Sequence, residues 1–322
     1  MRVSTSMIFN SGSSGIQNRQ SDLFKVQNQM STGRRILSPE DDPIGAAEVL
    51  KVSQSKSVNK QFLDNQGNAQ VQLTFLESTL GSVSDELVRI IEIAKQAESP
   101  SYSASQRGMI ATELKGRMEN LIGLANTQDG TGLYIFAGYQ SATKPFEEIS
   151  QTTPPATYKL SETLGESYVK YSGDAGKSTL QVTASKDMAV SENGLDVFMQ
   201  VKDSLGVVTG RTLFDSLQNL INNLDGSLPY DPAVQTQAFA DLSSGLDHIS
   251  NVRASVGARQ NSLDNLTLAG QDSAYLYDAR LSDLQDLDYA EAISDFSRFQ
   301  MQLEAAQLSF KQSSQLSLFN IL

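Results

Sequence analysis

The sequence predicts a mainly α-helical protein, in which the N- and C-terminal flanks form a long antiparallel helical rod or coiled coil and a small β-rich α+β domain is inserted between them. Three observations support this class. Apolar residues recur every three or four positions in both flanks. The stretch between the flanks is richer in Gly, Pro, Thr and Tyr and carries short alternating runs. Hydrophobic residues are only 39% of the 322 residues, which suits narrow stripes on long helices.

The first flank carries the clearest repeat. Its apolar positions are spaced alternately four and three, and the one polar member is Gln66. The stripe comprises Phe62, Gln66, Ala69, Leu73, Leu76, Leu80, Val83, Leu87, Ile90, Ala94 and Ala97. Asp42 followed by Pro43 is typical of an N-cap and a first helical turn. We therefore expect one helix from Pro43 to Glu98, about 80 Å long at ~1.5 Å per residue.

The region after this helix predicts shorter elements. Ser103 with Gln106 indicates a capping box that opens the next helix. In the middle of the chain, the alternation from Leu180 to Ala184 and the run Tyr168 to Tyr171 predict two strands. A further helix is expected over Leu213–Leu224, with Gly226 as its stop signal.

The second flank returns to the helical repeat after Asp231-Pro232. Its members are Ala238, Leu242, Ile249, Val252, Val256, Leu263 and Leu266, followed later by Tyr289, Ala292, Phe296, Phe299, Leu303, Ala306 and Phe310. We expect three parts: terminal core segments 1–38 and 288–322, a helical rod of 39–130 and 231–287, and an inserted domain over 131–230.

The two chain ends share a pattern that predicts an interface. Phe9, Ile16, Leu23 and Met30 are seven residues apart. Residues 1–35 carry a net charge of +4 and residues 278–322 a net charge of −4, which favours their lying side by side, although screened surface pairs add little each. The last 18 residues contain one charge, Lys311. Because this end is so apolar, we expect other subunits to bury it. The alternative is that the stripes close a monomeric helical bundle.

Bulk composition excludes several classes of protein. The net charge of −12 argues against a nucleic-acid surface. Without a run of 18 apolar residues, no membrane insertion is predicted. There is no Cys, which excludes disulfides and Cys-ligated metals. Polar residues interrupt the first nine positions, so a cleaved secretory signal is not predicted.

Motifs that resemble enzyme or metal sites are incomplete. Gly176-Lys177-Ser178 has Tyr171 where a phosphate-binding loop needs glycine, so a turn between strands is expected. Asp283, Asp286 and Asp288 lack calcium-loop spacing and read as a solvated acidic helix face. His248, the single histidine, reads as a helix-surface residue. We expect no enzyme, no cofactor and no metal.

Several short motifs resemble the family of flagellar hook–filament junction proteins, the hook-associated protein 3 family. The opening Met1–Met7 and the segment Tyr134–Gly138 are similar to that family, and Ser31–Pro43 is similar to a loop shared with flagellins. Asp286–Ile293 and the end Ser317–Leu322 resemble its C-terminal signature. The resemblance covers both flanks, about two thirds of the chain, and leaves the middle unmatched.

The resemblance implies a structural subunit of the bacterial flagellum. It would form a ring of its own copies between hook-associated protein 1 and the flagellin filament, after export by the flagellar type III route to the cell exterior without signal cleavage. It also implies a flagellar export chaperone at the C-terminal helix. Carried over by position, the inter-subunit contacts would be Phe9, Ile16, Leu23, Met30, Phe296, Phe299, Leu303, Phe310 and Phe319. Arg34, Arg35, Asp41 and Asp42 would form the bend between core and rod.

Three alternatives stay open. Flagellin, the filament subunit, shares the same loop and would grow long polymers. A nucleotide hydrolase housed in the middle domain would bind nucleotide. A cytosolic helical adaptor would be absent from detached flagella.

Overall fold

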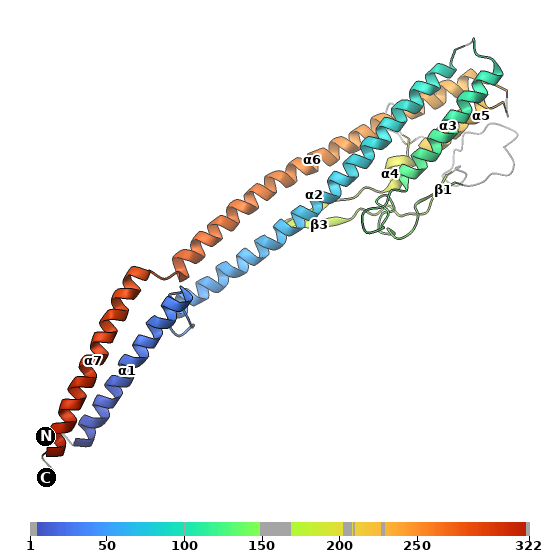
Figure 1. Cartoon of the computed structure of the whole chain (residues 1–322). Coiled ribbons are helices and arrows are strands. Elements are labelled where there is room, and N and C mark those ends of the chain that lie inside the picture. The colour runs from blue at the N-terminus through green and yellow to red at the C-terminus, as the bar shows by residue number, and fades with distance from the viewer. Residues whose placement is uncertain are drawn as a thin grey trace. The chain divides into compact units, whose positions relative to one another are not determined.

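The computed structural model describes residues 5–99, 101–148, 169–201, 208, 210–226 and 229–319 (Figure 1). The chain divides into two compact units. Residues 1–60 and 271–322 form one, here called the terminal unit, and residues 61–270 form the other, the central unit. Two long helices, α2 (Pro43–Ala97) and α6 (Pro232–Gln285), contribute to both. The three-part division expected from sequence has other boundaries and stays a prediction.

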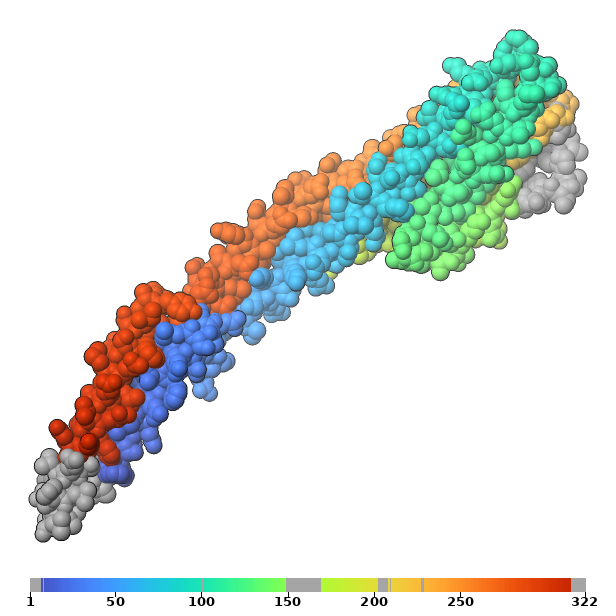
Figure 2. All heavy atoms as spheres, viewed as in Figure 1, coloured from blue at the N-terminus to red at the C-terminus, as the bar shows by residue number. Residues whose placement is uncertain are grey.

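The terminal unit is built mainly from α1 (Thr5–Thr32) and α7 (Tyr289–Phe319). These helices lie side by side, blue against red in Figures 1 and 2. Their pairing is antiparallel, since the Phe9 and Phe310 rings are 5.1 Å apart at one end and Tyr289 reaches the carbonyl of Met30 at the other. The two ends of the chain therefore pack together, as the charge and repeat patterns predict.

The central unit contains the hydrophobic core. The stripe predicted on α2 is buried from Gln66 to Ala97. On α6 the predicted residues Ala238, Leu242, Ile249, Val256 and Leu263 are buried as well. The guanidinium of Arg253 on α6 lies 2.7 Å from the carboxylate of Glu77 on α2. The prediction that helices of the two flanks pack against each other is therefore confirmed.

Three shorter helices complete this unit. The predicted capping box, Ser103 with Gln106, opens α3 (Ala104–Ala125). The helix expected over 213–224 is α5 (Leu213–Leu224), and Gly226 follows it with a φ of +82°, a conformation that glycine adopts without strain. A single turn, α4 (Gly194–Phe198), adds Phe198, whose ring lies 5.1 Å from Phe136 and 5.3 Å from Phe146.

The described strands form two antiparallel hairpin-like pairs. β1 (Phe146–Glu148) pairs with β2 (Val169–Tyr171), and β3 (Thr179–Thr183) pairs with β4 (Lys186–Ala189). The two predicted strands are present, although Ala184 lies in the β3–β4 turn and is exposed. Tyr168 lies outside the described residues. Over the described part of the chain, no helix is long and apolar enough to cross a membrane.

Candidate functional site: the terminal helices and the bend

The predicted contact stripes of α1 and α7 are partly buried within a single chain. Phe9 is 55% exposed. The other described members of the stripes are half-buried: Ile16, Leu23, Met30, Phe296, Phe299, Leu303 and Phe310. Gly12 leaves room for the Phe310 ring, because a Cβ built there would lie 2.5 Å from Phe310 Cδ2. Phe319 is the last residue of α7, and its side chain lies outside the described part. One side of each stripe thus packs on the other helix of the same subunit.

A second apolar set on these helices remains exposed. It comprises Met7, Phe24, Ile293, Met301 and Leu308, each more than half exposed. We call it the outward apolar set. Its members lie off the seven-residue repeat and so were not predicted from sequence; the spacings of eight and seven along α7 were the available signal. For large side chains of a helix pair, this exposure is typical of a surface that another protein covers.

The bend is formed by two helix breaks that hydrogen-bond to one another. The first break separates α1 from α2 and the second, residues 286–288, separates α6 from α7. The Arg35 amide donates to the Gln285 carbonyl at 2.8 Å, and the Leu287 amide donates to the Gly33 carbonyl at 3.0 Å. Gly33 has a φ of +70°, which a side chain would disfavour. Backbone atoms therefore join the two breaks.

The four predicted bend residues all lie here and have different roles. The Arg35 guanidinium donates to the Leu284 carbonyl at 2.9 Å and lies 3.5 Å from the Asp42 carboxylate. Asp42 accepts from the Gly45 amide at 2.8 Å, which caps the start of α2. Arg34 participates through its backbone, in a bridge with Asp286.

Asp41 organises the loop between α1 and α2. Its carboxylate accepts from the amides of Leu37 at 3.1 Å and Ser38 at 3.0 Å. The Lys25 ammonium lies 2.7 Å away. Lys25 holds the pKa of Asp41 below its usual value, and the amide of Ser38 adds to this effect. The carboxylate is therefore charged at neutral pH and ties α1 to the loop.

Sequence reasoning missed two further contributors to the bend. The Tyr289 hydroxyl donates to the Met30 carbonyl at 3.2 Å. Asp288 accepts from the Ala290 amide at 2.8 Å and so begins α7. The role of Asp288 could have been predicted, because an aspartate before a helical repeat is an N-cap signal. The hydrogen bond of Tyr289 joins residues far apart in the sequence, and no local pattern encodes it.

The incomplete motifs have structural roles. Lys177 lies in the loop between β2 and β3, where a turn between strands was predicted, and pairs with Glu192 at 2.6 Å. His248 Nε2 lies 2.8 Å from the Asp196 carbonyl on the surface of α6. Asp286 accepts from Ser282. Within the described ranges, no group of three His, Cys, Asp or Glu side chains is arranged to hold a metal ion.

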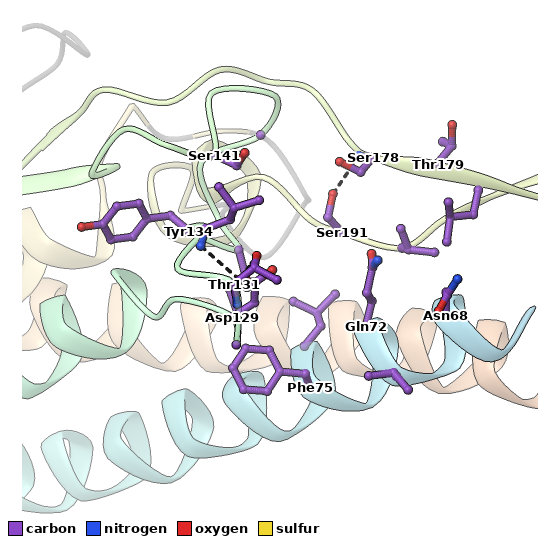
Figure 3. Close-up of a pocket in the computed structure, with 18 residues that line it drawn as sticks. Asn68, Gln72, Phe75, Asp129, Thr131, Tyr134, Ser141, Ser178, Thr179 and Ser191 are labelled. Carbon is purple, nitrogen blue, oxygen red and sulfur yellow. Dashed lines mark hydrogen bonds between the residues drawn. The ribbon is translucent and has the colours of Figure 1, made fainter. Parts of the chain in front are cut away.

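The central unit also has an open pocket of about 570 Å³ (Figure 3). One wall is α2, which contributes Asn68, Gln72 and Phe75; Phe75 lies near Asp129, whereas Gln72 points toward Ser191. Asp129 is the one ionisable carboxylate among the lining residues, and it already accepts from the amides of Thr131 and Leu133. The lining therefore offers amides, hydroxyls and apolar groups without a nucleophile–base pair.

Comparison with known proteins connects this geometry to a family. The bacterial flagellin N-terminal helical region matches residues 3–141, and the bacterial flagellin C-terminal helical region matches residues 241–322. Flagellar hook-associated protein 3 of Escherichia coli (strain K12) is 32% identical, with 100% of this chain and 99% of that protein covered. The Salmonella typhimurium protein of the same name is 28% identical over the same shares. A Listeria monocytogenes flagellin is 21% identical over 98% of this chain and 96% of its own length.

Solved structures agree on the fold. A putative flagellar hook-associated protein from Vibrio parahaemolyticus aligns with a TM-score of 0.64 at 19% identity, covering 76% of this chain and all of that one. Hook-associated protein 3 from Legionella pneumophila aligns with a TM-score of 0.61 at 21% identity, covering 73% and 98%. With paired terminal helices, a capped bend and a full-length relative at 32% identity, this chain belongs to the family of flagellar hook-associated protein 3.

Proposed function

We propose that this chain is the structural subunit of the hook–filament junction, and that its copies form a ring between hook-associated protein 1 and the flagellin filament. The family consists of structural flagellar proteins, so the chain is a component of the flagellum and not an enzyme. Assembly would proceed by packing of α1 and α7 from neighbouring subunits. The outward apolar set carries this proposal.

The energetic argument rests on the five exposed side chains of that set. Burying a large apolar side chain stabilises a complex by roughly 1.5–3 kcal/mol. Because these five are 53–67% exposed in the single chain, they would contribute about 4–10 kcal/mol before the cost of association is subtracted, and that cost is of similar size. Many subunits in a closed ring can therefore assemble through a contact that would be weak between two.

The predicted stripe residues and bend residues have complementary roles in this proposal. Phe9, Ile16, Leu23, Met30, Phe296, Phe299, Leu303, Phe310 and Phe319 would pair α1 with α7 and present their remaining exposed surface to neighbours. Arg34, Arg35, Asp41 and Asp42 would hold the bend between a polymer core and an outer rod. The division into segments 1–38 with 288–322, 39–130 with 231–287, and 131–230 describes these layers.

Partners and location follow from the same proposal. The contacts would be other copies of this chain, hook-associated protein 1 and flagellin. Before assembly, a flagellar export chaperone would cover the C-terminal helix. The protein would leave the cell by the flagellar type III route without signal cleavage, and would act outside the cell.

Flagellin itself is the second candidate. It is supported by the matches to the two flagellin helical regions, whereas the flagellins found are 21–24% identical. Polymer length separates the two. A junction subunit mixed with filament seeds forms a short cap, while a flagellin extends the filament.

The test is complementation of a strain that lacks this protein. A Met301→Glu, Leu308→Glu variant places two charges in the outward apolar set. We expect loss of swimming in soft agar and release of flagellin into the medium, because the charges cannot be buried between subunits. The matched control is Gln300→Glu with Gln307→Glu, which adds the same charges at exposed polar positions of α7. Normal swimming of the first variant, at native levels of secreted protein, contradicts the proposal.

A further inference from the structure

The β3–β4 hairpin of the central unit contacts both long helices. Side chains of α2 bind carbonyls of β3, and side chains of α6 bind β4 and the residues after it. The hydrogen bonds described below come from a short stretch of each helix: residues 65–66 on α2 and 259–262 on α6. A two-stranded hairpin has two open edges, and here helix side chains occupy both.

On the α2 side, the contact depends on a bulge in β3. The pairing of β3 with β4 shifts register between Gln181 and Thr183, which leaves Val182 without a strand partner. Asn65 Nδ2 donates to the Gln181 carbonyl at 2.8 Å, and Gln66 Nε2 donates to the Val182 carbonyl at 2.7 Å. The bulge thus turns two carbonyls toward the helix.

Gln66 is an unusual member of the α2 stripe. It is 3% exposed, and its Oε1 atom has no hydrogen-bond partner among the described atoms. An unsatisfied buried amide oxygen is destabilising compared with an apolar side chain of similar size. Packing therefore does not explain a glutamine here, but its bond to the bulge of β3 does.

On the α6 side, Arg259 has the corresponding role. Its guanidinium donates to the Ala189 carbonyl at 2.9 Å and pairs with the Glu192 carboxylate, a side chain that is 6% exposed. Lys186 at the start of β4 donates to the Ser262 hydroxyl at 2.9 Å. Arg259 interrupts the apolar repeat of α6, just as Gln66 interrupts that of α2.

Two heptad stripes do not determine their own stagger. Sliding α6 along α2 by seven residues, about 10.5 Å, again places apolar positions opposite apolar positions. A polar group buried at a single position specifies one register, because its partner exists at one place only. We propose that the β3–β4 hairpin fixes the register of α2 against α6, and that Gln66 and Arg259 are the positioning residues through which it does so.

Engineered cysteine pairs, bridged by a short bismaleimide crosslinker, can measure this stagger directly, because the native chain has no cysteine. Thr74 Oγ1 and Gln260 Nε2 are 3.4 Å apart, so crosslinking of Thr74→Cys with Gln260→Cys reports the observed register. Thr74→Cys with Thr267→Cys reports a shift of seven residues in one direction. Gly67→Cys with Gln260→Cys reports the same shift in the other direction.

In the otherwise native full-length chain, only the first pair should be crosslinked. In the Gln66→Leu, Arg259→Met background both stripes become apolar and the hydrogen bonds of Gln66 and Arg259 to the hairpin are removed. The shifted pairs should then become crosslinked. Lys115→Met, which removes a surface ion pair with Asp225, is the control and should leave only the first pair. Crosslinking of the first pair alone in the double variant overturns the proposal, and so does crosslinking of a shifted pair in the control.

A second measurement uses a single variant and tests the proposal even where the double variant does not fold. In the single variant Gln66→Leu, amides of β3 and β4 should exchange with solvent roughly tenfold faster, because the hairpin loses the bond from Gln66 to the Val182 carbonyl. Gln70→Leu is the matched control, since Gln70 also has a buried Oε1 without a partner among the described atoms. Equal hairpin protection in the two variants excludes the role assigned to Gln66.

Discussion

At the scale of single residues, Asp41 links the charge state of the terminal unit to its geometry. Its carboxylate binds two backbone amides of the loop and the Lys25 ammonium. The pKa of Asp41 is lowered from 3.8, and Lys25 is the main cause. A lowered pKa in the folded state means that the charged form stabilises the fold above the unfolded pKa and loses this effect as the pH falls through the folded pKa.

We therefore predict that the loop after α1 is insensitive to pH from neutrality down to about pH 4, the usual range of an aspartate pKa, and rearranges below it. The amide resonances of Leu37 and Ser38 report the change. Lys25→Met should move the transition to higher pH, because the main cause of the lowered pKa is gone. Asp41→Asn should abolish it; a transition that persists in Asp41→Asn would assign it to another group.

A second prediction at the scale of residues concerns substitutions at Gly33. Its φ of +70° costs other residues about 1–2 kcal/mol. Gly33→Ala should therefore weaken the hydrogen bonds of the bend and speed exchange of the Arg35 and Leu287 amides. Gly33→Asn places the same Cβ near the Tyr289 hydroxyl, but asparagine tolerates this backbone conformation better. Slower exchange in the alanine variant than in the asparagine variant contradicts the argument.

At the scale of elements, two glycines in α1 separate helix propensity from packing. A Cβ at Gly12 would meet the Phe310 ring at 2.5 Å, whereas nothing lies within 4 Å of one at Gly15. Alanine is favoured over glycine in a helix by roughly 0.5–1 kcal/mol. Gly15→Ala should slow exchange of α1 amides, measured by mass spectrometry. Gly12→Ala should accelerate exchange in both α1 and α7, because Phe310 must move; equal protection in both variants would show that the ring adapts without cost.

Helices were predictable because their signals are local. The α2 stripe, the Ser103 capping box and the stop at Gly226 each depend on residues within a few positions of one another. The outward apolar set was missed because it lies off the main repeat. The bonds of Asn65 and Gln66 to β3 join residues 116 positions apart, and no local pattern anticipates such a contact.

At the scale of the whole molecule, burial differs sharply between the two units. The cluster of buried hydrophobic residues runs from Ala69 to Leu263 and lies entirely in the central unit. In the described part of the terminal unit, the buried hydrophobic residues are Val26, Leu281 and Ala292. Neither this contrast nor the boundaries near 60 and 270 could be predicted, because the helical repeat continues through both positions.

We predict that limited trypsin digestion of the free monomer cuts the terminal unit first. Arg19, Lys25, Arg280 and Arg298 should be cleaved before Arg89, Arg117 and Arg253, since local opening is easiest where few apolar contacts must break. Mass spectrometry of early time points gives the order. Comparable rates at both groups would mean that the lone terminal unit is as stable as the central one, which would remove the need for neighbours.

The joint between the two helix breaks has a consequence for mechanical load. Its central hydrogen bonds run from peptide to peptide, between residues 33–35 and 285–287, and do not depend on which side chains are present. A force along α1 would be transmitted to α7 through these backbone hydrogen bonds as well as through apolar contacts, which are not directional. Substitution of side chains leaves these backbone bonds in place, except at position 33, where a Cβ disfavours the φ of +70°.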